Sequence, residues 1–278
     1  MQLKEIVAKT GFRFRKDLGQ NFIEDDGILK SIVAAAAVGG DDTVLEIGVG
    51  AGTLTRAIAE KAGRVFGYEI DKNLAPVLSR TLSGVDNAEV IFKDFMRVPM
   101  KEVEKDLGKD YTVIANLPYY ITSPIVMRLL EQAENCKRIV VTVQKEVADR
   151  FCASEGSSDY GAITVAINAL GSAKTVLFIP REDFYPVPNV DSAVVKIDVD
   201  KNKFKDLDYG AFRETVRIAF LSRRKTLANN LINTLKIPRA KAEEVLSAAG
   251  IAADLRGERL SADEFRALSI VLKDNELI

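Results

Sequence analysis

The sequence of 278 residues contains no histidine and no tryptophan. Histidine is the commonest general base near neutral pH and a frequent metal ligand, so we expect chemistry without imidazole and without a bound metal. Cysteine is scarce as well, with only Cys136 and Cys152 present. Two cysteines form neither a disulfide framework nor a metal-ligand cluster. With no signal peptide recognisable, this predicts a cytoplasmic protein.

Long hydrophobic runs are also missing. The longest run of small apolar residues, 32–38, falls well short of the roughly 18–20 residues that span a bilayer. It is typical of one helix, and we expect no membrane partner. Hydrophobic residues nevertheless make up 47% of the chain, which predicts a sizeable core rather than disorder.

Short apolar runs alternate with helix-like segments between residues 43 and 145. This alternation is typical of a parallel α/β sheet with helices on both faces, which binds ligands beyond the carboxyl ends of its strands. Residues 173–179 and 190–199 predict two further strands. After residue 200 only helices are predicted, at 209–235, 239–249 and 261–272. The predicted strands of the alternating region are 43–47, 64–68, 89–92, 111–115 and 138–143, and the predicted helices are 53–63, 71–82 and 123–134.

Polar or flexible residues follow four of these strands. Glycines at 48, 50 and 52 open the first helix, where they allow a ligand to approach the backbone closely. Glu69 can accept hydrogen bonds from two ribose hydroxyls, and Asp94 can accept one from an adenine amine. Acids at such positions also cap helices, so capping is the alternative interpretation.

The segment 115–120, Ala-Asn-Leu-Pro-Tyr-Tyr, ends the fourth strand because Pro118 cannot donate to a sheet ladder. Asn116 and the carbonyl of Leu117 can accept from an amine, and Tyr119 can stack on a planar base. An ordinary turn opened by Asn-x-Pro is the alternative.

The glycine spacing separates two cofactor classes. The dinucleotide motif Gly-x-Gly-x-x-Gly requires glycine at 53, where Thr53 stands. The pattern therefore favours S-adenosylmethionine, which has no pyrophosphate, over NAD. An NAD-dependent dehydrogenase stays as the competing interpretation.

Five segments together resemble the ribosomal RNA adenine N6-dimethyltransferases over nearly the whole chain. The last of them resembles the small-subunit (16S) enzymes more than the antibiotic-resistance enzymes that methylate large-subunit rRNA. The segments are 16–24, 46–52, 116–124, 184–192 and 220–227. The resemblance implies a Rossmann-like class I methyltransferase sheet of seven strands and a small all-helical C-terminal domain. We expect a methyltransferase domain at 1–203, including an N-terminal segment 1–25, and an RNA-binding helical domain at 204–278.

The resemblance also implies the reaction and further site residues. The reaction is dimethylation at N6 of two adjacent adenosines near the 3′ end of small-subunit rRNA. S-adenosylmethionine contacts are expected from Asn21 and Ile23. Asn116 and Leu117 would orient the amine and Tyr119 would stack on the base. Phe184 would cover the other face of the base from an exposed loop, whereas core packing is the alternative for this aromatic.

Basic residues gather at two places. Residues 213–241 hold eight lysines and arginines and one acid, Glu214, although the whole chain has a net charge of −1. A solvated helix face usually mixes both signs, so we interpret the cluster as a phosphate-binding surface. The expected RNA-binding residues are Arg13, Arg15, Lys16, Arg223, Arg224 and Lys225.

The expected partner is small-subunit rRNA within the immature 30S subunit, bound by a monomer. Two alternatives share the fold but not the substrate: a large-subunit rRNA adenine methyltransferase and a DNA adenine methyltransferase. A third, non-catalytic role as an assembly checkpoint is compatible with catalysis.

Overall fold

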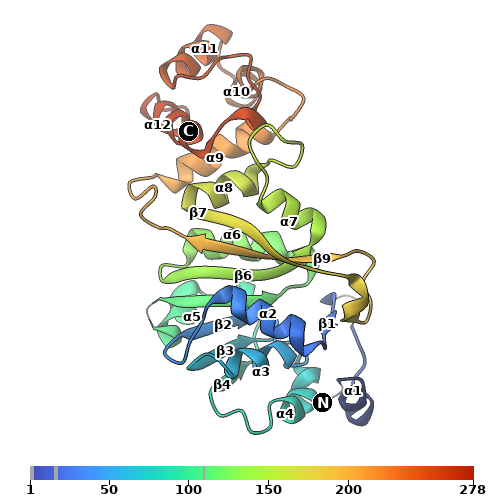
Figure 1. Cartoon of the computed structure of the whole chain (residues 1–278). Coiled ribbons are helices and arrows are strands. Elements are labelled where there is room, and N and C mark those ends of the chain that lie inside the picture. The colour runs from blue at the N-terminus through green and yellow to red at the C-terminus, as the bar shows by residue number, and fades with distance from the viewer. Residues whose placement is uncertain (1–2, 16–17, 109) are drawn as a thin grey trace. The chain divides into compact units, whose positions relative to one another are not determined.

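A computed structural model describes residues 3–15, 18–108 and 110–278 of the chain (Figure 1). The chain forms two compact units. The first consists of Met1–Ala148 and Ala173–Val199, and the second of Asp149–Ser172 and Asp200–Ile278.

The first unit is built on a seven-stranded sheet with the order β4-β3-β2-β5-β6-β9-β7. The five strands from β4 to β6 pair in parallel, and β9 pairs antiparallel with β6. The predicted parallel sheet and its two-strand extension are thus confirmed. The strands are β2 (Thr43–Ile47), β3 (Arg64–Tyr68), β4 (Ala88–Ile91), β5 (Tyr111–Asn116), β6 (Cys136–Gln144), β7 (Gly171–Ile179) and β9 (Ser192–Val199).

Helices α2 (Asp26–Ala36) and α3 (Thr53–Ala59) pack on one face of this sheet. Their apolar side chains share a buried cluster with one inward-facing residue from each of five strands: Val44, Val65, Ile114, Val140 and Val194. Because side chains alternate along a strand, the intervening residues, such as Leu45, face the other side. Helix α5 (Met100–Leu107) contacts β2, and helix α6 (Thr122–Gln132) contacts β6. Helix α4 (Ala75–Thr81) packs in a further cluster with Phe22.

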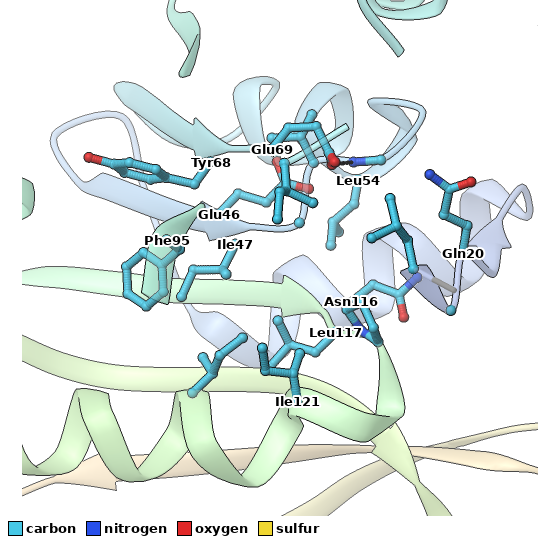
Figure 2. A pocket seen from close by; sticks show the side chains of 18 of the residues that line it. Gln20, Glu46, Ile47, Leu54, Tyr68, Glu69, Phe95, Asn116, Leu117 and Ile121 are labelled. Carbon is cyan, nitrogen blue, oxygen red and sulfur yellow. Dashed lines mark hydrogen bonds between the residues drawn. The ribbon is translucent and has the colours of Figure 1, made fainter. Parts of the chain in front are cut away.

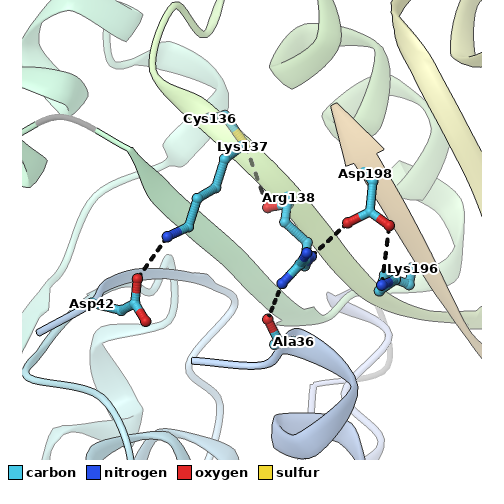
Figure 3. Close-up of polar contacts among 7 residues, drawn as sticks. All are labelled: Ala36, Asp42, Cys136, Lys137, Arg138, Lys196 and Asp198. Atoms are coloured by element: carbon cyan, nitrogen blue, oxygen red, sulfur yellow. Dashed lines mark hydrogen bonds and ion pairs between the residues drawn. The ribbon is translucent and has the colours of Figure 1, made fainter. Parts of the chain in front are cut away.

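The amino-terminal end of β6 is held by a polar network (Figure 3). The guanidinium of Arg138 donates from Nε to Asp198 Oδ1 over 2.6 Å and from Nη1 to the carbonyl of Ala36 over 2.7 Å. Lys137 pairs with Asp42 at 2.6 Å. These contacts link α2, β6 and β9 at the end of the sheet opposite the carboxyl ends of the parallel strands, so they support the scaffold rather than a ligand site.

Several elements have no counterpart in the sequence-based prediction. The most consequential is a two-stranded antiparallel ribbon of β1 (Phe22–Ile23) and β8 (Phe184–Tyr185), in which Ile23 pairs with Phe184. Strands of two residues carry no periodicity, and this pair forms only because segments 160 positions apart meet. The other missed elements are α1 (Leu3–Thr10), α5, α7 (Lys145–Phe151) and α8 (Ala162–Leu170).

From residue 200 onward the described residues of the second unit form helices joined by turns, with no strand among them. Its helices there are α9 (Tyr209–Phe220), α10 (Leu227–Leu235), α11 (Arg239–Ala248) and α12 (Ala262–Asp274). The single helix predicted at 209–235 is therefore wrong. A turn at 221–226 divides it, and Thr226 begins α10 by accepting from the amide of Asn229.

The division between the units differs from the predicted one at residue 203. Residues 149–172 belong with the C-terminal helices, because the hydroxyl of Tyr160 donates to the carbonyl of Leu260 over 2.8 Å and its ring contacts Phe220. Helix α8 also packs against α9 and α12. Amino-acid composition does not reveal that this segment from the middle of the chain belongs with the C-terminal helices.

Neither Cys136 nor Cys152 forms a disulfide. Of the helices in the described part of the chain, none combines the length and the apolar character needed to cross a bilayer.

Candidate active site

A cavity of about 1050 Å³, a volume that includes the solvent at its mouth, lies beyond the carboxyl ends of β2, β3 and β5 (Figure 2). This is where the strand order reverses between β2 and β5, the usual ligand position in a doubly wound sheet. The predicted cofactor residues all line it: Asn21, Ile23, Gly48, Gly50, Glu69, Asp94 and Asn116. Leu117 and Tyr119 line it too.

Glu69 holds the glycine loop after β2. Its Oε2 accepts from the amide of Gly50 and its Oε1 from the amide of Asp71, both over 2.7 Å. Burial raises the pKa of the Glu69 carboxyl, although these two amides oppose the shift. Each oxygen still has a lone pair for a ligand hydroxyl.

Gly50 is a position in this loop where an added side chain would clash. Its φ of +58° lies in the left-handed region, and an added Cβ would come within 2.7 Å of the Phe22 ring. The N-terminal segment that carries Phe22 therefore lies directly against the loop.

Two hydrogen bonds hold this N-terminal segment in place. The side-chain nitrogen of Asn116 donates to the carbonyl of Asn21 over 2.8 Å, and the hydroxyl of Thr53 donates to the carbonyl of Ile23 over 2.9 Å. Since the amide nitrogen of Asn116 is used in this way, its oxygen is the atom that can accept from a ligand.

Tyr119 is anchored by its hydroxyl, which shares a 2.8 Å hydrogen bond with Ser192 Oγ at the start of β9. Burial raises the pKa of Tyr119, and Ser192 only partly offsets this, so the phenol is neutral near pH 7. The ring is half-buried and lies at the cavity, where a planar base can stack on it.

Asp94 lies at the cavity and also caps a turn. Its Oδ1 accepts from the amide of Met96 over 2.9 Å, and Oδ2 lies 3.2 Å from Arg97 Nε. The capping alternative is thus realised, and it leaves lone pairs of the carboxylate for a ligand.

The prediction that Phe184 occupies an exposed loop is wrong. Its side chain is only 3% exposed, and it packs with Ile23 and Leu54 in the buried cluster beneath α2 and α3. The pairing of β8 with β1 draws it inward, and the described residues that line the cavity do not include it. Core packing, the competing interpretation, is therefore the one the structure bears out.

The predicted basic residues differ in their surroundings. Arg13 and Arg15 are exposed, and Lys16 lies outside the described residues. Arg224 and Lys225 are exposed in the turn before α10. Arg223 is also exposed, but its guanidinium donates to the carbonyls of Ser158 and Tyr160 within the second unit and lies 3.6 Å from Glu258.

Sequence reasoning noted Glu46 as an acid before the glycine loop but gave it no role, and it missed Arg128, which the described residues lining the cavity do not include. Glu46, on β2, lines the cavity with a completely buried carboxyl. Arg128, on α6, is buried and donates to the carbonyls of Phe95 and Val98, with its guanidinium 4.9 Å from the centre of the Phe95 ring. It fixes the segment that follows Asp94. The acid before the glycine loop was visible in the sequence, whereas nothing in the sequence distinguishes Arg128 from a surface arginine.

Comparisons with known proteins cover nearly the whole chain and agree with one another. The sequence profile of the family described as "Ribosomal RNA adenine dimethylase" matches residues 11–274. Proteins named "Ribosomal RNA small subunit methyltransferase A" from Geobacillus thermodenitrificans and Clostridioides difficile are 44% and 43% identical. Each alignment covers 97% of this chain and 94% of the relative.

Two solved structures share the fold. A dimethyladenosine transferase from Plasmodium falciparum is 27% identical with a TM-score of 0.77, and the alignment covers 92% of this chain and 98% of that one. The 23S rRNA methyltransferase ErmE is 28% identical with a TM-score of 0.67 over 91% of this chain and 99% of that one. The predicted Rossmann-like methyltransferase fold is confirmed. The chain belongs to the ribosomal RNA adenine dimethylase family.

Proposed function

We propose that this protein transfers methyl groups from S-adenosylmethionine to N6 of two adjacent adenosines near the 3′ end of small-subunit rRNA. The observation that carries the proposal is the Asn116–Asn21 hydrogen bond, which commits the amide nitrogen and leaves the oxygen as an acceptor at the cavity. Family membership and the small-subunit names of the 43–44% identical relatives support it.

The cavity fits a nucleoside ligand with a positive charge. Glu69 has lone pairs for ribose hydroxyls, and Asp94 has lone pairs for the adenine amine. The backbone at Gly48 and Gly50, with Asn21 and Ile23, would line the remainder. When bound, S-adenosylmethionine supplies a methyl group activated by its positively charged sulfur.

The chain's own residues then act by positioning. The side-chain oxygen of Asn116 and the carbonyl of Leu117 accept the two N6 hydrogens, which directs the nitrogen lone pair away from the ring plane. Tyr119 stacks on a base that has left its helical stack. A reaction with an activated donor needs orientation and electrostatics more than a base, and the proton departs to water.

Basic residues of both units supply RNA affinity in this proposal. Arg224 and Lys225 present exposed charge to phosphates, and Arg13 and Arg15 do so from the N-terminal segment. The shape of folded rRNA in the immature 30S subunit provides specificity. We propose that the protein works as a monomer in the cytoplasm, where that substrate is assembled, with the region from about 204 onward as the RNA-binding part.

The test uses methyl-labelled S-adenosylmethionine with immature small subunits, large-subunit rRNA and naked DNA as parallel substrates. Mass spectrometry of the digested nucleic acid should find N6,N6-dimethyladenosine in small-subunit rRNA alone. Label confined to large-subunit rRNA would support the antibiotic-resistance type of enzyme instead.

A further inference from the structure

The carboxyl of Glu46 is a buried acid without a partner. Its side chain is 0% exposed, yet neither of its oxygens has a hydrogen-bond partner among the described residues. Buried polar groups are nearly always satisfied, so an orphaned carboxyl that lines a ligand cavity needs an explanation. The adjacent acid, Glu69, differs in this respect, since both of its oxygens accept from backbone amides.

The surroundings of Glu46 disfavour its charged form. The other charged side chains among the described residues that line the cavity are Glu69, Lys93 and Asp94, and Lys93 is exposed. Burial raises the pKa of the Glu46 carboxyl to about 8. The nearby Thr55 lowers this pKa, although its hydroxyl forms no hydrogen bond of good geometry, and the charge of Glu69 raises it.

We infer that Glu46 is the residue by which the cavity distinguishes the sulfonium of a methyl donor from the uncharged thioether of its product, because this buried, unpartnered carboxyl at the cavity ionises when the positively charged sulfur enters. This rests on the proposed function, which supplies the ligand class. A positive charge within about 4–6 Å of a carboxyl favours the carboxylate. The released proton goes to solvent, and it returns when the sulfonium becomes a thioether.

The consequence is a donor preference that depends on pH. Because the pKa of Glu46 is about 8, its carboxyl is mostly protonated near pH 7 in the free protein. Binding of the cation must remove that proton, so donor affinity increases with pH and levels off above about pH 8. The affinity for the product, whose sulfur is uncharged, has no such dependence on Glu46. The preference for donor over product therefore increases as pH rises toward about 8.

Calorimetric titration of the full chain tests this directly. S-adenosylmethionine and S-adenosylhomocysteine are each titrated at pH 7 in phosphate and in Tris, whose ionisation enthalpies differ, so the difference in heat counts the protons exchanged. The donor should release up to about one proton more from the wild type than from Glu46→Gln. The homocysteine product should show no difference between the two proteins. Protons from the ligand's own amine are the same in both and cancel.

Glu46→Gln should also reduce the preference for donor over product at pH 7 by at least about tenfold, because nearly complete proton release requires donor binding to lower the pKa of Glu46 to a unit or more below 7. Thr55→Val keeps the carboxyl and provides a second variant should the first fail to fold. It should move the levelling of donor affinity to higher pH, because the hydroxyl lowers the pKa of Glu46.

The outcomes separate the two proposals. Equal proton release with donor and product, or release that persists in Glu46→Gln, overturns the role of Glu46 and leaves the proposed function intact. Failure of the wild type to bind either ligand overturns both.

Discussion

The side-chain nitrogen of Asn116 lies 2.8 Å from the main-chain oxygen of Asn21, although 95 positions separate the two residues. One hydrogen bond thus joins the segment before the sheet to the end of its fourth parallel strand. It orients the amide that we assign to the substrate and fixes a segment that lines the cofactor cavity.

Asn116→Ala should lower single-turnover methylation about 100- to 1,000-fold, as expected for removal of one preorganised polar contact in an active site. Affinity for S-adenosylhomocysteine should change only a few-fold, because Glu69, Asp94 and the glycine loop stay in place. Rapid-quench kinetics and calorimetry measure the two quantities. Asn202→Ala, at an exposed asparagine in the other unit, is the control. Normal turnover at saturation with lost cofactor binding would contradict the assigned role.

Gly50→Ala should abolish cofactor binding and destabilise the fold. Gly84→Ala is the matched control, because Gly84 also has a positive φ, of +75°, but has no atom within 4 Å of an added Cβ. Both variants bear the cost of a left-handed alanine, about 1–2 kcal/mol. Only Gly50→Ala also pushes against Phe22. Urea unfolding and S-adenosylhomocysteine titration of both variants measure the difference, and equal losses would show that backbone conformation alone matters.

Tyr119→Phe should cost about 0.5–1.5 kcal/mol of unfolding free energy through loss of the hydrogen bond to Ser192. Methylation should be only slightly slower, since the ring remains. Tyr119→Ala also removes the stacking surface, worth roughly 1–3 kcal/mol per base, and should raise KM for RNA. Steady-state kinetics on immature small subunits compares them. A Phe variant as impaired as the Ala variant would mean that the hydroxyl, not the ring, contributes the effect.

RNA binding should weaken steeply between about 50 and 200 mM salt. Arg224→Ala and Lys225→Ala should each reduce the slope of log affinity against log salt by about 1 and leave stability unchanged. Arg223→Ala should in addition lower the unfolding free energy, because its guanidinium donates to the carbonyls of Ser158 and Tyr160. Filter binding measures the salt dependence of RNA affinity, and chemical denaturation measures the unfolding free energy. RNA binding that does not change with salt would contradict the proposed contacts between these basic residues and phosphates.

The stability of the protein should depend on Glu46. Its carboxyl ionises near 4.5 when unfolded and near 8 when folded, so the folded state binds more protons between these values. The unfolding free energy therefore falls as pH rises through this window, by at most about 1.4 kcal/mol per pH unit from this group. In Glu46→Gln this part of the slope should vanish. Urea unfolding at pH 5, 6.5 and 8 compares the two proteins, and parallel pH profiles would contradict the assignment.

Much of the site was predictable because its residues lie at the carboxyl ends of strands. Periodicity located the strands, and parallel strands end at a common edge, so Glu69, Asp94 and Asn116 had to lie together. The bounds predicted for β2 and β3 agree with those observed. The prediction for Phe184 was wrong because the position of this residue depends on a ribbon of two-residue strands between distant segments, which no local pattern indicates. The inclusion of residues 149–172 in the second unit was hidden for the same reason.

The sequence by itself determined the α/β sheet, the glycine loop and the identity of the groups at the strand ends, because hydrophobic period and backbone restrictions are local properties. It also excluded imidazole chemistry outright. Only the tertiary structure decided that Asn116 gives its nitrogen to Asn21, that Phe184 is buried, and that Glu46 has no partner in the described chain. Hydrogen-bond partners and the solvation of a charge depend on residues far apart in sequence, and these come together only in the folded chain.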